Sequence, residues 1–284
     1  MYPDYPFPSH YLELKGGRLH YIDEGSGPVI VMVHGNPTWS YYFRHLISTL
    51  RDNYRIIAVD HMGCGLSDKP QDYPYCLAQH IDNLECLLTH LQIDRFSLVV
   101  HDWGGAIGIG SAVNHIDKID KIVVMNTAAF RSNRIPLRIQ LCRLPFIGEI
   151  LVRMFNGFAW PATFMAVKNK MKPAVAKAFL APYNSWKNRV AVYNFVRDIP
   201  LDSHHKSYET LVEIENRLVL IRDSGVPLLI VWGGGDFCFN DHFFKEWTER
   251  FPEAETRYFH DGGHYILEDK HLEIVPILKS FFRV

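Results

Sequence analysis

One short segment holds the residue best suited to covalent chemistry. Asp102 follows the apolar run 96–100 and precedes Trp103-Gly104-Gly105, after which a helix-like stretch begins. A strand that ends at a reactive residue and turns through small residues into a helix is a nucleophile elbow, usually seen as G-x-S-x-G. Here the elbow residue is an aspartate. A carboxylate attacks carbon by displacement and leaves an ester to be hydrolysed, so the motif favours alkyl transfer over acyl transfer.

A histidine in a glycine loop is the expected base. His264 follows Gly262 and Gly263, which make a loop able to bring the imidazole to the elbow. Imidazole is the natural water-activating group near neutral pH. Fifteen histidines are available, but His264 also lies C-terminal to the nucleophile and the candidate acid, in an order typical of such elbows. We expect His34 and His101 to fix loops.

Asp236 is the expected orienting acid. It follows an apolar run, 226–232, through three glycines that leave room for a close approach. Asp241 is the runner-up, although it or its neighbour could instead cap the following helix, and Asp261 is expected to be a loop residue. The other position open to an acid follows the run ending at residue 125. It holds Asn126 and no carboxylate, which favours Asp236.

Two further residues could bind a leaving group. Trp103 offers an indole N–H beside the nucleophile, and indole is a donor only, which suits a halide or another weakly basic anion. Asn36, in the segment 34–39, offers an amide. The backbone N–H groups of Asn36 and Trp103 are expected to form the oxyanion hole. Alone, Trp103 could be a core residue and Asn36 a turn residue; together at two strand ends they indicate a site.

The surrounding elements predict an α/β fold. Short apolar segments alternate with helical ones, at 19–22, 28–33, 55–60, 96–100, 121–125, 226–232 and 258–259. This pattern is typical of a mostly parallel sheet flanked by helices, whose active site lies beyond the carboxyl ends of the strands. The segment 131–221 breaks the alternation with aromatic and aliphatic residues at helical spacing. We expect it to be a helical cap domain inserted into a core domain of residues 1–130 and 222–284, with some residues facing a substrate cavity.

Composition excludes several classes of function. The 284 residues carry a net charge of −1 with no basic tract, so nucleic acid is not an expected partner. The five cysteines lack CxxC spacing and are typical of reduced thiols in a cytoplasmic protein. No secretion signal and no run of 18 apolar residues is visible, so no transmembrane segment is expected. The segment 63–70 lacks a complete dinucleotide fingerprint, and no metal-ligand spacing occurs. We expect no cofactor, and we expect a monomer.

At 34–38, 63–70 and 101–105 the chain resembles the haloalkane dehalogenases of the α/β-hydrolase fold, and the resemblance covers nearly the whole chain. It implies Asp102 as nucleophile, His264 as base, Asp236 as acid, and Asn36 with Trp103 as the halide pair. The resemblance is to the subfamilies whose acid follows the later strand. The leading hypothesis is a haloalkane dehalogenase-like hydrolase. Its substrate would be a small apolar alkyl halide and its products an alcohol and halide.

Three alternatives stay open. The segments 232–239 and 263–269 resemble the β-lactone decarboxylases of bacterial long-chain olefin synthesis, which implies attack by the nucleophile on an alkyl β-lactone, release of carbon dioxide and a cis-alkene, and olefin-pathway proteins as partners. Epoxide hydrolases share the elbow but usually have an aromatic residue at the Asn36 position and protonate the epoxide with cap tyrosines, here Tyr183, Tyr193 and Tyr208. A ligand-binding receptor would need no nucleophile, base and acid together.

Overall fold

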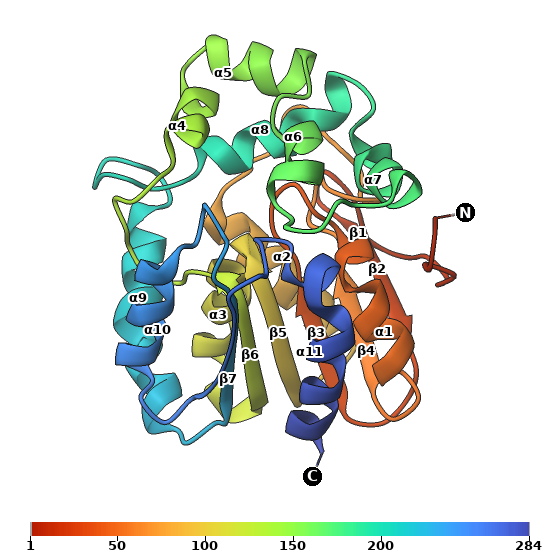
Figure 1. Cartoon of the computed structure of the whole chain (residues 1–284), viewed down its shortest axis with the longest axis vertical. Coiled ribbons are helices and arrows are strands. Elements are labelled where there is room, and N and C mark those ends of the chain that lie inside the picture. Colours follow the sequence, from red (N-terminus) through yellow and green to blue (C-terminus); the bar gives the residue numbers. More distant parts are fainter. Residues whose placement is uncertain (1, 284) are drawn as a thin grey trace.

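A computed structural model describes residues 2–283, which form a single eight-stranded sheet flanked by helices (Figure 1). The strand order is β1-β2-β4-β3-β5-β6-β7-β8. The strands are β1 (His10–Leu14), β2 (Gly17–Glu24), β3 (Val29–Val33), β4 (Arg55–Val59), β5 (Phe96–Asp102), β6 (Ile119–Thr127), β7 (Leu228–Gly233) and β8 (Glu255–Phe259). β1 and β2 pair antiparallel, and all pairs from β4 to β8 are parallel. The predicted α/β-hydrolase fold is confirmed.

Within residues 2–283 the α-helices are α1 (Arg44–Leu50), α2 (Leu77–His90), α3 (Trp103–Asn114), α4 (Leu137–Arg143), α5 (Ile147–Glu149), α6 (Ala159–Met165), α7 (Pro173–Leu180), α8 (Val190–Arg197), α9 (Tyr208–Asp223), α10 (Asp241–Arg250) and α11 (Ile266–Phe282). Shorter helical turns are η1 (Ser40–Phe43), η2 (Ile116–Lys118), η3 (Ile150–Met154), η4 (Ala181–Tyr183) and η5 (Lys187–Arg189).

The central strands are apolar because both faces of the sheet are covered. Side chains from α2, α3, α9 and α10 form one hydrophobic cluster with one face, and those from α1 and α11 form a second cluster with the other. Strands buried on both faces read as continuous apolar runs, which is the pattern of β3 and β5. Arg44 of α1 also donates two hydrogen bonds to Glu268 of α11, at 2.5 and 2.8 Å, in a buried ion pair.

The helices α4 to α8 lie above the end of the sheet at which β5 reaches Asp102 (Figure 1). α9 falls inside the predicted cap range, yet its apolar side chains pack with α2 and α3 in the core cluster. The cap range 131–221 stays a prediction. None of the helices within residues 2–283 is long and apolar enough to cross a membrane.

Candidate active site

The chain turns sharply at Asp102, between β5 and α3. The residue has φ 53° and ψ −127°, a conformation that costs energy for a side chain with a Cβ. Two glycines let the turn approach its neighbours. A Cβ on Gly104 would collide with the Val33 carbonyl, and one on Gly105 with the Thr127 hydroxyl. That hydroxyl donates to the Asp102 carbonyl oxygen. The geometry is that of a nucleophile elbow, as the sequence predicted.

The two oxygens of the Asp102 carboxylate have different environments. Oδ1 accepts the backbone N–H of Asn36 at 2.7 Å, and the backbone N–H of Trp103 also bonds the carboxylate. Oδ2 faces His264 Nε2 at 3.4 Å. Burial alone would raise the pKa of Asp102, but the hydrogen bond and charge of His264 outweigh burial and lower it. Asp102 is therefore an anion whose Oδ1 is held by the Asn36 N–H, while Oδ2 faces His264.

His264 connects Asp102 to Asp236. Its Nδ1 lies 2.8 Å from Asp236 Oδ2, and its Nε2 is the atom that faces Asp102. Both acids are buried, and so is the imidazole. Burial alone would lower the pKa of His264, but the two carboxylates more than compensate and raise it from 6.5 to about 10. Before substrate binds, His264 is an imidazolium between two carboxylates.

Asp236 is held by groups that sequence reasoning did not assign. The Asn126 side-chain amide donates to Asp236 Oδ2 at 3.0 Å, and the Cys238 backbone N–H donates to Oδ1 at 2.6 Å. Asn126 is fully buried and also accepts the Gly233 N–H at 2.8 Å. Position 126 holds an amide in place of a carboxylate, and that amide contacts Asp236 directly.

The runner-up acids point elsewhere. Asp241 begins α10 and accepts the Tyr258 hydroxyl, whereas Asp261 is exposed and pairs with Lys270. Asn240, and not Asp241, caps α10 through its side chain, at 3.1 Å from the His242 N–H. Of the three candidates, only Asp236 contacts His264 in the described residues.

His34 and His101 lie in loop-fixing positions. His34 Nε2 accepts the His61 backbone N–H at 3.0 Å, so its own proton is on Nδ1 and donates to the Gly35 carbonyl at 2.6 Å. His101 Nε2 donates to the His264 carbonyl oxygen at 2.8 Å. Burial lowers the pKa of His101 to about 3, so the ring is neutral. Both histidines therefore bind backbone groups beside Asp102 and His264.

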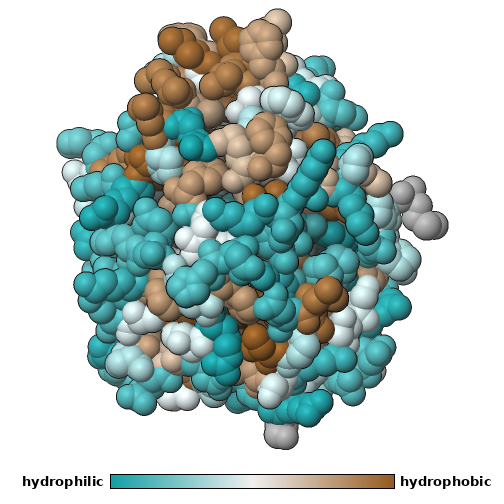
Figure 2. Space-filling view, in the orientation of Figure 1, coloured by the Kyte–Doolittle hydropathy of each residue, from teal (hydrophilic) through white to brown (hydrophobic). Residues whose placement is uncertain are grey.

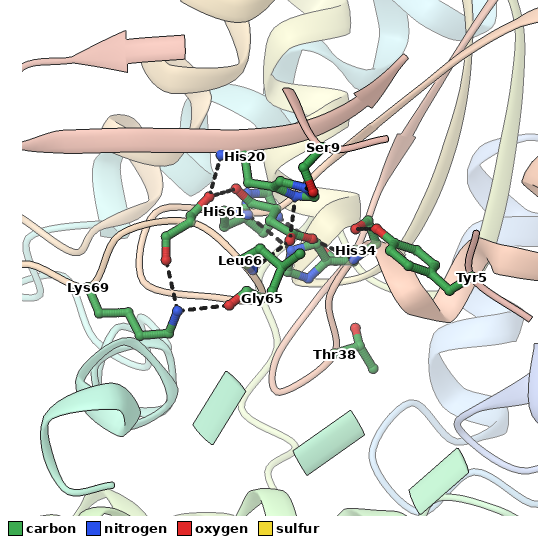
Figure 3. Close-up of polar contacts among 12 residues, drawn as sticks. Tyr5, Ser9, His20, His34, Thr38, His61, Gly65, Leu66 and Lys69 are labelled. Atoms are coloured by element: carbon green, nitrogen blue, oxygen red, sulfur yellow. Dashed lines mark hydrogen bonds and ion pairs between the residues drawn. The ribbon is translucent and has the colours of Figure 1, made fainter. Parts of the chain in front are cut away.

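A buried hydrogen bond between Asp60 and His20 supports the loops behind the site (Figure 3). Asp60, just after β4, lies 2.8 Å from His20 Nδ1 and accepts the backbone N–H groups of Ser40 and Leu66 at 2.6 and 2.8 Å. Burial alone would raise the pKa of Asp60, but His20 and the amide donors lower it to about 2. The carboxylate thus joins the loop after β4 to the segment that begins η1, which follows the Asn36 loop.

Asn36 and Trp103 line one cavity with Asp102 and His264. One N–H of the Asn36 side chain donates to the Val192 carbonyl of α8 at 3.1 Å, a contact between the loop after β3 and α8. Because an amide carries two N–H groups, the second stays available to an anion in the cavity. The structure therefore brings all five predicted site residues together.

The cavity has a volume of about 360 Å³, within the range usual for small-molecule sites. Its walls are mainly apolar and come from the ends of the sheet strands and from α4, η3, α6 and α8, including Phe130, Leu151, Phe158 and Phe239. None of Tyr183, Tyr193 and Tyr208 lines it. Tyr183 is buried and donates its hydroxyl to the Thr38 carbonyl at 3.1 Å. The described residues thus offer no cap tyrosine at the place where an epoxide hydrolase would need one.

Comparison with known proteins places this geometry in a family. The family described as "alpha/beta hydrolase fold" matches residues 28–271. The chain belongs to that family. It is 44% identical to a cis-3-alkyl-4-alkyloxetan-2-one decarboxylase of Shewanella oneidensis, over 97% of this chain and 88% of the relative. It is 41% identical to a decarboxylase of the same name from Xanthomonas campestris, over 99% and 97%.

The dehalogenases of the family are more distant in sequence. Haloalkane dehalogenase 2 of Mycobacterium tuberculosis is 29% identical, over 93% of this chain and 91% of that protein. The crystal structure of the haloalkane dehalogenase DatA from Agrobacterium tumefaciens has a TM-score of 0.86 at 25% identity, covering 96% of this chain and 95% of that one. Both resemblances predicted from the motifs are confirmed, and the chain is an α/β-hydrolase-fold enzyme.

Proposed function

We propose that the enzyme converts cis-3-alkyl-4-alkyloxetan-2-ones, which are β-lactones, to cis-alkenes and carbon dioxide. The observation that carries this proposal is the pair of decarboxylases at 44% and 41% identity over nearly the whole chain. The apolar cavity beside Asp102 supports it, because two alkyl substituents need an apolar wall. The sequence motifs favoured halide displacement. Because of these two relatives, we rank decarboxylation first instead.

In the proposed first step, Asp102 Oδ2 attacks C4, the alkyl-bearing ring carbon that is bonded to the ring oxygen. The new bond joins Oδ2 to C4, the bond between C4 and the ring oxygen breaks, and the lactone opens to a carboxylate. The Asn36 backbone N–H that holds Oδ1 then donates to the carbonyl oxygen of the ester, beside the Trp103 backbone N–H that also bonds this carboxylate. The Asn36 amide and the Trp103 indole lie beside Asp102 in the cavity and suit the opening carboxylate as they would suit a halide.

In the second step, the carbon–carbon bond to the new carboxylate breaks and carbon dioxide leaves. That electron pair forms the alkene, and the Asp102 carboxylate departs from the neighbouring carbon. The attack inverts one carbon, and anti elimination then places the two alkyl groups on the same side, so a cis-lactone gives a cis-alkene without bond rotation. No water is consumed, and the nucleophile returns to its starting state.

The proposed decarboxylation and a hydrolysis differ in the protonation state of His264 after the ester has formed. Ring opening moves the negative charge from Asp102 to a substrate carboxylate only two carbons away, so His264 keeps an anionic neighbour and stays protonated. Halide displacement instead produces a free anion that leaves. The ester then removes one of the two charges that raise the pKa of His264, and the imidazole can become the base that activates water. The same residues therefore support both reactions.

The test is turnover in heavy-oxygen water with two substrates, a cis-β-lactone carrying two alkyl chains and 1-bromobutane. Products are followed at ambient temperature by proton NMR, because strained lactones also lose carbon dioxide on heating. The Asp102 peptide is then examined by mass spectrometry. We expect cis-alkene from the lactone and no label in Asp102, with Asp102→Ala inactive. Hydroxy acid or labelled Asp102 from the lactone would contradict the proposal.

Haloalkane hydrolysis is the second candidate, favoured by the position of Asn36 and Trp103 in the cavity. It predicts bromide release from 1-bromobutane and solvent oxygen in Asp102. We further propose a cytoplasmic monomer whose ligand is a small apolar substrate. The cytoplasmic location is supported by the cysteines, which are free thiols (Cys64, Cys76, Cys86, Cys142 and Cys238).

A further inference from the structure

The outer side of the cap carries a concentrated apolar surface. Of the fifteen large hydrophobic side chains that are exposed in the described residues, ten lie in residues 137–164, so they are concentrated and not scattered. We call these ten the cap patch. Its most exposed members are Phe146 at 81%, Leu137 at 72% and Phe155 at 66%. Figure 2 shows hydrophobic side chains gathered over the end of the molecule where Figure 1 places α4 and α5.

The same part of the chain is strongly basic. Residues 131–189 contain eleven Lys and Arg but a single acid, Glu149. The whole chain has 30 Lys and Arg against 31 Asp and Glu, so the remainder carries 19 against 30. Lys168, Lys170 and Lys172 are exposed and directly follow α6, which carries Trp160 and Phe164 of the patch. The apolar end of the molecule is thus positive, and the rest of the molecule is negative.

The cap patch is continuous with the active-site cavity. Leu141 of α4 is 46% exposed and also lines the cavity. Arg138 on the same helix is exposed and lines the cavity as well. Leu151 and Phe158, between the exposed residues of η3 and α6, form part of the same wall. The same helical segments therefore carry the patch on their outer side and line the cavity on their inner side. At Leu141 and Arg138 the two surfaces meet.

We propose that the cap docks onto the surface of a lipid bilayer that contains anionic phospholipids. Aromatic and aliphatic side chains of the patch would enter the boundary between headgroups and acyl chains, and the surrounding lysines and arginines would bind headgroup phosphates. An anionic bilayer surface would accommodate both the exposed hydrophobic side chains and the positive charge around them. A second copy of the chain does not, because a symmetric contact would set two positively charged caps against each other.

Docking of this kind does not depend on the proposed decarboxylation. If that function holds, docking places the cap wall of the cavity against the phase in which a dialkyl lactone and an alkene dissolve. The substrate could then pass from the bilayer along the patch to Asp102 without crossing water. The binding experiment below measures docking without any substrate, so its failure and the failure of the proposed reaction are distinguishable.

The experiment is co-sedimentation of the full chain with vesicles of phosphatidylcholine alone or with added phosphatidylglycerol. The test variants are Phe146→Ser with Phe155→Ser, and Lys170→Glu with Lys172→Glu. Their matched controls are Leu272→Ser, at an 80% exposed residue on α11, and Lys15→Glu with Lys245→Glu. Circular dichroism checks that each variant is folded. In parallel, Trp160 fluorescence with brominated lipid, with Trp160→Phe as reference, reports insertion directly.

We expect the wild type to sediment with anionic vesicles and much less with neutral ones. Each surface lysine contributes about 1 kcal/mol near such a membrane, so the lysine variant should bind at least about tenfold more weakly, and both controls should bind as the wild type does. Several outcomes would overturn the proposal: no sedimentation, equal sedimentation of test and control variants, or no preference for anionic lipid. Self-association without lipid that Phe146→Ser and Phe155→Ser abolish would assign the patch to a second copy instead.

Discussion

Replacement of Asp236 by asparagine tests the charge argument for His264. In the wild type, two carboxylates raise the pKa of His264 to about 10, with Asp236 Oδ2 only 2.8 Å from Nδ1. Unit charges about 4 Å apart attract by roughly 4 kcal/mol at an effective dielectric constant of about 20, which is worth about three pH units in a pKa. Asp236→Asn removes that attraction while keeping the shape, so the pKa of His264 should fall to about 7.

The proposed decarboxylation needs the imidazolium, and this sets the sign of the pH effect. Alkene formation by the wild type should stay level from pH 7 to 9 and decline only as the pH approaches about 10. In Asp236→Asn the decline should begin about three pH units lower. The assay is the initial rate of cis-alkene formation against pH, paired with a nitrogen NMR titration of the histidine rings.

Asp241→Asn is the matched control, because Asp241 bonds Tyr258 and not His264. Its pH profile should follow that of the wild type. An Asp236→Asn profile that coincides with the wild-type profile would refute the reasoning, as would a wild-type rate that rises through pH 7. A rising limb near neutral pH would mean that neutral His264 acts as a base, and would favour the hydrolytic reaction.

Three further predictions concern buried polar groups. Asn126→Ala removes one donor from Asp236 and leaves the buried Gly233 N–H without a partner, so urea unfolding should show a loss of about 1–3 kcal/mol together with slower turnover. Glu268→Gln leaves the Arg44 charge buried and unpaired; a loss of about 3–5 kcal/mol in the same measurement is expected, and a loss below about 1 kcal/mol would contradict it. The pKa of Asp60 is lowered from 3.8 to about 2, so its contribution of about 2 kcal/mol is present above pH 4 and lost as the pH falls toward 2. Acid unfolding should show this loss in the wild type, and Asp60→Asn should lack that pH-dependent part.

The sheet could be predicted where both faces of a strand are buried. Residues 29–33 and 96–100 read as apolar runs, and the polar residues after them fall at the carboxyl edge of the sheet. The edge strand His10–Leu14 gave no such signal, because its residues alternate between exposed and half-buried and it pairs on one side only. The bounds of the predicted cap range could not be placed from the sequence alone. α9 has the same helical periodicity as the segments before it, but its apolar side chains pack in the core cluster.

Contacts within the site could be predicted only in part. The elbow, the glycine loops and the strand ends pointed to Asp102, His264 and Asp236, because each has a local signal in the chain. The contacts of Asn126 with Asp236 and of Asn36 with Val192 join residues 110 and 156 positions apart, and no local pattern encodes them. The charge asymmetry was also missed, because a net charge of −1 conceals a basic segment, residues 131–189, in an otherwise acidic chain.

The residues of the site do not by themselves select between the two reactions. As proposed, both begin with attack by the Asp102 carboxylate, and both use the same amide donors and the same imidazole. They differ in where the negative charge goes after the ester forms. A halide leaves, which frees His264 to become a base; a lactone carboxylate stays tethered and keeps His264 protonated. Substrate structure therefore decides the fate of the ester. An alkyl halide and a β-lactone given to the same enzyme should leave different oxygen labels on the same aspartate.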